Sequence, residues 1–122
     1  MSYDPSNVFA KILRGEIPCK KVYEDDFALA FHDIHPKAPV HVLVIPKGPY
    51  ATCDDFIASA DDAEIVGFQR ALGKAINAAD VIGTGYRLIA NCGTDAHQEV
   101  PHYHVHILGG RNLGPMLAKI EG

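Results

Sequence analysis

The sequence predicts an α+β domain with a mostly antiparallel five-stranded sheet, one long helix and one short helix. Five short segments are rich in β-branched and apolar residues, and turn residues separate most of them. One longer segment, residues 61–79, repeats apolar residues three and four positions apart, as an amphipathic helix does. The strands follow one another mostly in meander order with the long helix across them, which is typical of an α+β arrangement.

The first part of the chain contains a predicted short helix and a predicted β-hairpin. Residues 8–13 form the helix, which ends near Gly15. Residues 21–24 and 28–32 are expected to pair as two strands, because the Asp25-Asp26 dipeptide between them is typical of a tight turn.

The remaining three strands contain most of the strongly apolar runs. Residues 40–46 are apolar on both faces, as a central strand should be, and His41 is the polar exception. The proline-bounded run 36–39 forms a rigid connection before this strand. Residues 86–91 predict a fourth strand, and the loop 92–99 leads to a fifth, which begins with a histidine-rich run.

The long helix is predicted from about Asp61 to Ala79. Ser59 is the expected N-cap, and the acidic Asp61, Asp62 and Glu64 would then lie favourably in the first turn. The apolar residues that define its buried face are Ile65, Phe68, Leu72, Ile76 and Ala79.

Three histidines occupy alternate positions near the C-terminus, at His102, His104 and His106. A β-strand points residues i, i+2 and i+4 to the same face, so one short strand would align all three, with Tyr103 and Val105 facing the other way. Histidine exchanges protons near neutral pH, acts as a nucleophile and binds metals. We therefore expect the chemistry of this protein at the histidine run.

Composition restricts the class of protein. The 122 residues suffice for one domain, and 48% hydrophobic with 21% charged residues is typical of a globular protein. The formal net charge is −4, and no block of lysine or arginine occurs. This argues against a nucleic acid as the main ligand, whereas a single nucleotide needs only a few local donors.

Neither a membrane location nor secretion is expected. No stretch approaches the roughly 20 apolar residues of a membrane span, and the first ten residues lack an apolar signal segment. The three cysteines, at 19, 53 and 92, are odd in number and far apart, which argues against a disulfide framework. A cytoplasmic protein is predicted.

Two kinds of chemistry fit the histidine run. His-x-His on a strand with a third histidine elsewhere can hold zinc, and His41 could complete such a set. Against zinc, the sequence shows no obvious neighbouring carboxylate to orient the ligands, and Asp33 and Glu99 are the candidates. Alternatively, a neutral imidazole attacks phosphorus, and neighbouring groups fix its tautomer and protonate the leaving group. The spacing alone leaves both open.

The run from His102 to Arg111 resembles the signature of the histidine triad (HIT) nucleotide-binding proteins, and further segments resemble the same family in the same order. These segments are residues 9–12, 15–18, 30–34, 36–39, His41, 45–47, 85–87 and 113–118. The resemblance covers about residues 7–118 and points to the purine nucleoside phosphoramidase branch. It implies a HIT-like fold, with residues 1–6 as an N-terminal extension and 7–122 as one domain with a C-terminal tail.

The resemblance implies hydrolysis of purine nucleoside 5′-phosphoramidates, such as AMP joined to an amine, to give AMP. His104 would be the nucleophile and form a nucleotidyl-histidine that water then cleaves. The carbonyl of His102 would hold the other ring nitrogen of His104 in its N–H form. His106 and His41 would contact phosphate oxygens and help to deliver a proton to the departing amine. No metal or other cofactor is implied.

The same resemblance implies a purine nucleotide pocket for AMP, GMP or an adenosine phosphoramidate. Asp33 would accept hydrogen bonds from the ribose hydroxyls, although by itself it could equally be a turn or cap aspartate. Asn91 and the backbone N–H groups of Glu99 and Val100 would hold the α-phosphate. The apolar residues expected around the purine are Phe9, Ile12, Ile17, Phe31 and Ile34.

The chain departs from the family pattern at several positions. His97 stands where many members have glycine, and Pro101 where they often have tyrosine. Glu99 occupies a position that is serine in animal relatives. Its carboxylate would repel a phosphate, so the backbone N–H is the expected contact. Arg87 is expected in a surface or dimer ion pair rather than on the phosphate.

The resemblance also bears on the partners of the protein and on rival functions. The family implies a homodimer whose sheets join edge to edge, and the apolar tail residues suited to an interface are Leu113, Met116, Leu117 and Ile120. One rival is a dinucleoside polyphosphate hydrolase of the same superfamily, for which only Lys47 and Arg111 offer extra positive charge. A second rival is a nucleotide-binding regulatory module without significant catalysis, and a third is a zinc protein.

Overall fold

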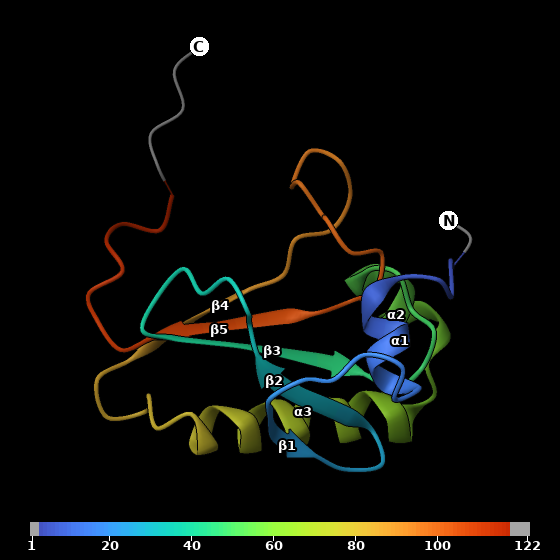
Figure 1. Cartoon of the computed structure of the whole chain (residues 1–122), viewed down its shortest axis with the longest axis horizontal. Helices are drawn as coiled ribbons and strands as arrows, with labels where there is room; N and C mark the ends of the chain where they lie inside the picture. The colour runs from blue at the N-terminus through green and yellow to red at the C-terminus, as the bar shows by residue number, and fades with distance from the viewer. Residues whose placement is uncertain (1–2, 118–122) are drawn as a thin grey trace.

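The computed structural model describes residues 3–117 and confirms an α+β fold with a five-stranded antiparallel sheet (Figure 1). The strands are β1 (Lys21–Glu24), β2 (Ala28–His32), β3 (Val40–Pro46), β4 (Tyr86–Ile89) and β5 (Val105–Gly109). The helices are α1 (Val8–Leu13), α2 (Cys53–Ser59) and α3 (Asp62–Ala78). None of the helices described has the length and apolar character needed to cross a membrane.

The order of strands in space differs from a simple meander. The order is β1-β2-β3-β5-β4, so that β5 lies between β3 and β4 and is hydrogen-bonded on both sides. His106 on β5 is opposite Leu43 on β3 and Ile89 on β4. The fourth strand ends at Ile89 rather than at the predicted Asn91. The histidine-bearing strand is therefore a central element of the sheet.

Helix α3 covers one face of the sheet and packs against β1, β2 and β3 (Figure 1). Its apolar period matches the prediction: Phe68, Leu72 and Ile76 are buried. The strands contribute Val42, Val44, Val105 and Ile107, among others, to the same core. Burial of this apolar area is the main stabilising contribution to the fold.

Two predictions about the helices were wrong. Asp61, not Ser59, is the N-cap of α3, and it forms a capping box with Glu64. Ser59 is instead the last residue of α2, a helix that the sequence analysis did not predict. Helix α2 begins after the N-cap Thr52 and has seven residues, of which Phe56 is the buried one. A helix this short with one buried residue shows no apolar period in the sequence.

The opposite face of the sheet is covered only in part. Helix α1 begins after Asn7, whose side chain accepts a hydrogen bond from the Ala10 N–H at 2.9 Å. Phe9 of α1 packs in a second, smaller core with Leu29, Phe31, Leu43 and Ile45. Because α1 has six residues, much of this face remains available for a site.

Strand β5 starts later than predicted, at Val105 instead of with the first histidine of the run. The preceding backbone N–H groups are used elsewhere: that of His102 donates to the Val100 carbonyl at 2.8 Å, and that of Tyr103 to the Tyr50 carbonyl at 2.7 Å. These loop contacts replace the sheet hydrogen bonds that a longer strand would have needed.

Candidate active site

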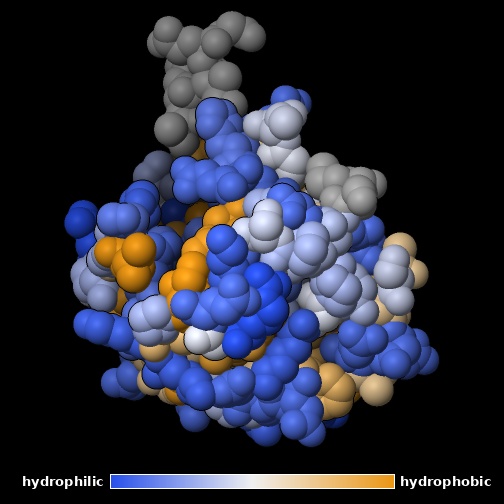
Figure 2. All heavy atoms as spheres, turned by 45° about the vertical axis from the view of Figure 1, so that its right-hand side comes forward, coloured by the Kyte–Doolittle hydropathy of each residue, from blue (hydrophilic) through white to orange (hydrophobic). Residues whose placement is uncertain are grey.

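A pocket of about 500 Å³ opens on the face of the sheet that α1 partly covers. Figure 2 shows apolar side chains recessed between hydrophilic ones on one face of the molecule. The volume is in the range typical of small-molecule sites. A larger and shallower depression of about 1080 Å³ lies along α3, but no histidine lines it.

The pocket collects almost all of the predicted site residues. Those that line it are Phe9, Ile12, Ile17, Phe31, Asp33, Ile34, His41, Asn91, Glu99, Val100, His104 and His106. They come from α1, from strands β2, β3 and β5 with adjoining loops, and from the loop before β5. These segments are far apart in the sequence. His102 is the exception, since its side chain does not line the pocket. Ile34 lies at the rim and is 84% exposed.

His104 is held in one tautomer by a backbone group. Its Nδ1 lies 2.6 Å from the carbonyl oxygen of His102. A carbonyl only accepts hydrogen bonds, so in the neutral ring Nδ1 carries the proton and Nε2 has a free lone pair. The ring is buried, and the edge-on ring of Phe9 lies 5.0 Å away between centroids. Burial lowers the pKa of His104, which keeps this lone pair available at neutral pH.

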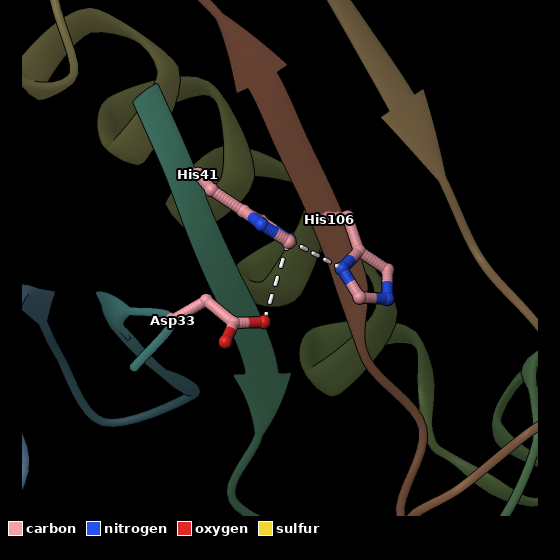
Figure 3. Close-up of side chains that lie close together, drawn as sticks. All are labelled: Asp33, His41 and His106. Atoms are coloured by element: carbon pink, nitrogen blue, oxygen red, sulfur yellow. Dashed lines mark hydrogen bonds and ion pairs between the residues drawn. The ribbon is translucent and has the colours of Figure 1, made fainter. Parts of the chain in front are cut away.

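His41 and His106 form a hydrogen-bonded pair across β3 and β5 (Figure 3). Their positions are diagonal neighbours, because His41 is opposite Leu108 in the register. The Lys37 backbone N–H donates to Nδ1 of His41 at 3.0 Å, so the proton of the neutral His41 is on Nε2. That Nε2 lies 2.8 Å from Nδ1 of His106, which must then accept. The remaining nitrogen of His106, Nε2, consequently carries an N–H.

His41, His104 and His106, three of the histidines that line the pocket, favour the neutral form near neutral pH. Burial lowers the pKa of His41, partly offset by the negative charge of Asp33. The pKa of His106 falls to about 4, first because of burial and then because His104 and His41 lie close by. The rings of His104 and His106 are 5.1 Å apart between centroids. The pocket therefore presents a nitrogen lone pair on His104 beside an N–H donor on His106.

Asp33 serves as a turn residue and as a neighbour of the histidine pair. Its Oδ1 accepts the backbone N–H of His35 at 2.8 Å, which is the turn role. Its Oδ2 lies 3.4 Å from Nε2 of His41 (Figure 3). This second oxygen retains lone pairs for another donor.

The set Asp33, His41 and His106 has donor atoms within 4.8 Å of one another, a spacing that a metal ion could use. The hydrogen bonds do not favour metal ligation, however. A ligating nitrogen needs a lone pair, whereas the Lys37 N–H leaves His41 with its proton on Nε2, the atom nearest the other two residues. In this arrangement Nε2 of His41 is a hydrogen-bond donor to His106.

His102 is a buried structural residue with its own hydrogen-bond network. Its Nε2 donates to the Pro46 carbonyl at 2.8 Å, and its Nδ1 accepts from the Tyr3 hydroxyl at 2.7 Å. The Asn7 amide in turn donates to the Tyr3 oxygen at 3.0 Å. No sequence motif pointed to Tyr3 or Asn7, because both contacts depend on the folded position of the N-terminal segment.

Positively charged side chains are scarce at the pocket. Lys37 lines it, but the Lys37 ammonium donates to the His35 carbonyl at 2.9 Å. Lys47 forms an ion pair with Glu24 at 2.9 Å. Arg87, expected in a surface or dimer ion pair, donates to the carbonyl of Gly114 at 2.8 Å. Ile120, predicted for the interface, lies outside the described residues.

Comparison with known proteins identifies the family. The HIT domain profile matches residues 14–113. An uncharacterized 13.2 kDa HIT-like protein of Azospirillum brasilense is 61% identical over 97% of both chains. The purine nucleoside phosphoramidase of Escherichia coli is 45% identical over 91% of this chain and 92% of its own. A histidine triad protein structure from Clostridium difficile superposes with a TM-score of 0.83 at 40% identity, covering 95% of this chain and 100% of that one. The chain belongs to the HIT family and has its fold.

Proposed function

We propose that this protein hydrolyses purine nucleoside 5′-phosphoramidates to the nucleoside monophosphate and an amine, through a nucleotidyl intermediate on His104. The observation that carries the proposal is the hydrogen bond from His104 Nδ1 to the His102 carbonyl, which leaves a lone pair on Nε2 in the pocket. The similarity to the Escherichia coli enzyme supports the same reaction class.

In the first step, Nε2 of His104 attacks phosphorus, and the P–N bond breaks with its electron pair moving to nitrogen. The departing nitrogen needs a proton to leave as an amine. We assign this proton to the His41–His106 pair, which takes one up together with the anionic substrate, since the negative charge offsets the cost of a buried positive charge. After the step the pair is neutral and His104 carries the nucleotidyl group.

In the second step, water attacks the same phosphorus and gives its proton back to the His41–His106 pair. The bond between phosphorus and Nε2 of His104 breaks, and its electron pair returns to the ring. The products are the nucleoside monophosphate and the original histidine. The pair is thus a proton donor in one step and a proton acceptor in the other.

The rest of the pocket suits a nucleoside monophosphate. Oδ2 of Asp33, which retains lone pairs, would accept the ribose hydroxyls, and the apolar residues of α1 and β2 would contact the purine. Asn91 and the backbone N–H groups of Glu99 and Val100 would hold the α-phosphate. Lys47 and Arg111 do not line the pocket, so a long polyphosphate would lack counter-charges. This distribution favours the phosphoramidase over a polyphosphate hydrolase.

The test is hydrolysis of adenosine 5′-phosphoramidate by chelator-treated protein, with His104→Ala as the control. The expected result is AMP release that requires His104, with an AMP adduct on the wild-type chain after a denaturing quench. Mass spectrometry of peptides then locates the adduct. Activity that returns only on addition of zinc, or that survives loss of His104, would overturn the mechanism.

We also propose a homodimer formed through the edge of the sheet at β4. This edge exposes Tyr86 and Leu88, which are 43% and 42% accessible. The opposite edge, β1, carries an ion pair between Lys21 and Glu24, a feature that discourages edge pairing. Light scattering coupled to gel filtration should give twice the chain mass, and Leu88→Lys should shift the protein towards the monomer.

A further inference from the structure

The pocket mouth carries an acidic side chain that the proposed reaction does not yet use. Glu99 lines the pocket and is exposed, and it forms no ion pair with any residue in the range 3–117. Its negative charge acts on His104 and raises the pKa of that ring, against the larger effect of burial. The carboxylate is therefore within electrostatic range of the proposed nucleophile.

The charges around this mouth are unbalanced. Asp33 and Glu99 are two carboxylates on the pocket wall, and Lys37 is the one lysine or arginine of residues 3–117 that lines it. The Lys37 ammonium is turned to the His35 carbonyl. His97 also lines the mouth and is exposed. A negatively charged group that the substrate carries besides its phosphate would be repelled by Glu99, whereas a positively charged group would be attracted.

The direction of the leaving group follows from the position of the nucleophile. An in-line displacement places the departing nitrogen opposite the attacking Nε2 of His104. Both residues line the pocket, but His104 is only 7% exposed, whereas Glu99 belongs to the exposed part of the lining. In the proposed reaction the leaving amine would therefore lie on the side of the phosphate away from His104, towards the exposed part of the pocket lining, to which Glu99 belongs.

We propose that Glu99 selects the leaving group, so that the protein prefers phosphoramidates whose departing amine carries a second, positively charged group. This inference rests on the proposed function and specifies its substrate class. A charge interaction of this kind at a solvent-exposed mouth corresponds to a preference of about threefold to tenfold, and salt weakens it.

The experiment compares three adenosine 5′-phosphoramidates with amines of similar length: propylamine, 1,3-diaminopropane and β-alanine. Their distal groups are neutral, positive and negative. Wild type is compared with Glu99→Gln, which keeps the shape of the side chain and the backbone N–H. Asp95→Asn is the matched control, because Asp95 is an exposed carboxylate of the same loop that does not line the pocket.

The measured quantity is kcat/KM for each charged substrate divided by that for the neutral one. Intrinsic differences between the amines cancel when the same ratio is compared between wild type and variant. In Glu99→Gln we expect the positive-to-neutral ratio to fall about threefold to tenfold and the negative-to-neutral ratio to rise. Asp95→Asn should leave both ratios within about twofold of wild type, and added salt should reduce the wild-type preference.

Two outcomes would overturn the inference in distinguishable ways. If Glu99→Gln changes all three substrates by one common factor, the carboxylate acts on the phosphate or the loop and does not select the amine, while the proposed reaction stands. If wild type releases AMP from none of the three, the proposed function itself is wrong and the inference falls with it.

Discussion

The two faces of the sheet differ in chemistry although the same strands build both. On the α3 side, β3 and β5 contribute Val42, Val44 and Val105 to a core of apolar side chains. On the other side, the same strands present His41 and His106 to an open pocket. Adjacent residues in a strand point to opposite faces, so each strand alternately places one side chain in the apolar core and the next in the pocket.

The difference shows how the pocket is kept in place. The histidine pair depends on the register of β3 and β5, and that register is fixed by the apolar residues packed under α3. A slip of one residue would exchange the two faces. The α3 side should therefore govern stability, and the pocket side should govern reaction rate.

The largest expected effect is on the pocket side, in His104→Ala. The variant loses the nucleophile, so kcat/KM for adenosine 5′-phosphoramidate should fall at least about 1,000-fold. The apolar core on the α3 side is untouched, so urea unfolding should remain cooperative. A steady-state assay and a urea titration on the same preparation check both statements. A decrease of less than tenfold would remove His104 from its assigned role.

The converse substitution is Ile107→Ala on the α3 side. Ile107 is fully buried, and truncation should lower the free energy of unfolding by about 2–5 kcal/mol through the cavity that it leaves. The rate per folded molecule should change much less than in His104→Ala. Denaturant unfolding measures the loss of stability. A steady-state assay, with the enzyme concentration corrected for the folded fraction, measures the rate per folded molecule. A rate loss as large as that of His104→Ala would break the distinction between the faces.

His102→Ala tests whether this histidine acts through its backbone or its side chain. The variant keeps the carbonyl that holds His104, but it leaves the Pro46 carbonyl and the Tyr3 hydroxyl without their partner. We expect a loss of about 1–3 kcal/mol in the free energy of unfolding. The decrease in kcat/KM should be far smaller than in His104→Ala. Tyr3→Phe removes one of the two hydrogen bonds and should cost less stability than His102→Ala.

The pocket side should also determine the response to acid. Burial lowers the pKa values of His41, His102, His104 and His106 below the 6.5 of an exposed histidine, and that of His106 to about 4. The folded state therefore binds fewer protons than the unfolded state below pH 6.5. The stability that these four neutral histidines contribute is fully present above pH 6.5 and falls as the pH decreases towards 4.

The same shifts predict the pH profile of the reaction. Nε2 of His104 stays unprotonated to a lower pH than a free imidazole does. The decrease of kcat/KM on the acid side should therefore lie below pH 6.5. Initial rates between pH 4.5 and 8 give this limb, and urea titrations over the same range give the stability. An acid limb at or above pH 6.5 would contradict the burial of a neutral His104.

The smallest effects are expected from basic residues that lie away from the pocket. Lys47→Ala and Arg111→Ala should change kcat/KM for the phosphoramidate by less than about twofold, because neither side chain lines the pocket. Parallel assays with diadenosine polyphosphates sharpen the comparison. A large loss restricted to the polyphosphates would favour the rival hydrolase.

Local sequence patterns were sufficient for most of the fold. The helical period of Phe68, Leu72 and Ile76 marked α3, and the apolar run at 40–46 marked the central β3. The pattern failed at α2, where Phe56 is the one buried residue of a seven-residue helix. It also failed at the start of β5, because the backbone N–H groups of His102 and Tyr103 bond to loops.

For the candidate site, too, one part could be predicted from local sequence patterns and another part could not. The sequence by itself determined which residue types the strands present, namely the histidines at alternate positions and the apolar residues between them. The tertiary structure alone decided that His102 turns to Pro46 and Tyr3, 56 and 99 positions away, and that the Lys37 N–H sets the tautomer of His41. The physical reason is range: side-chain periodicity is a local property of the backbone, whereas burial, tautomers and pKa values depend on groups that only folding brings into contact.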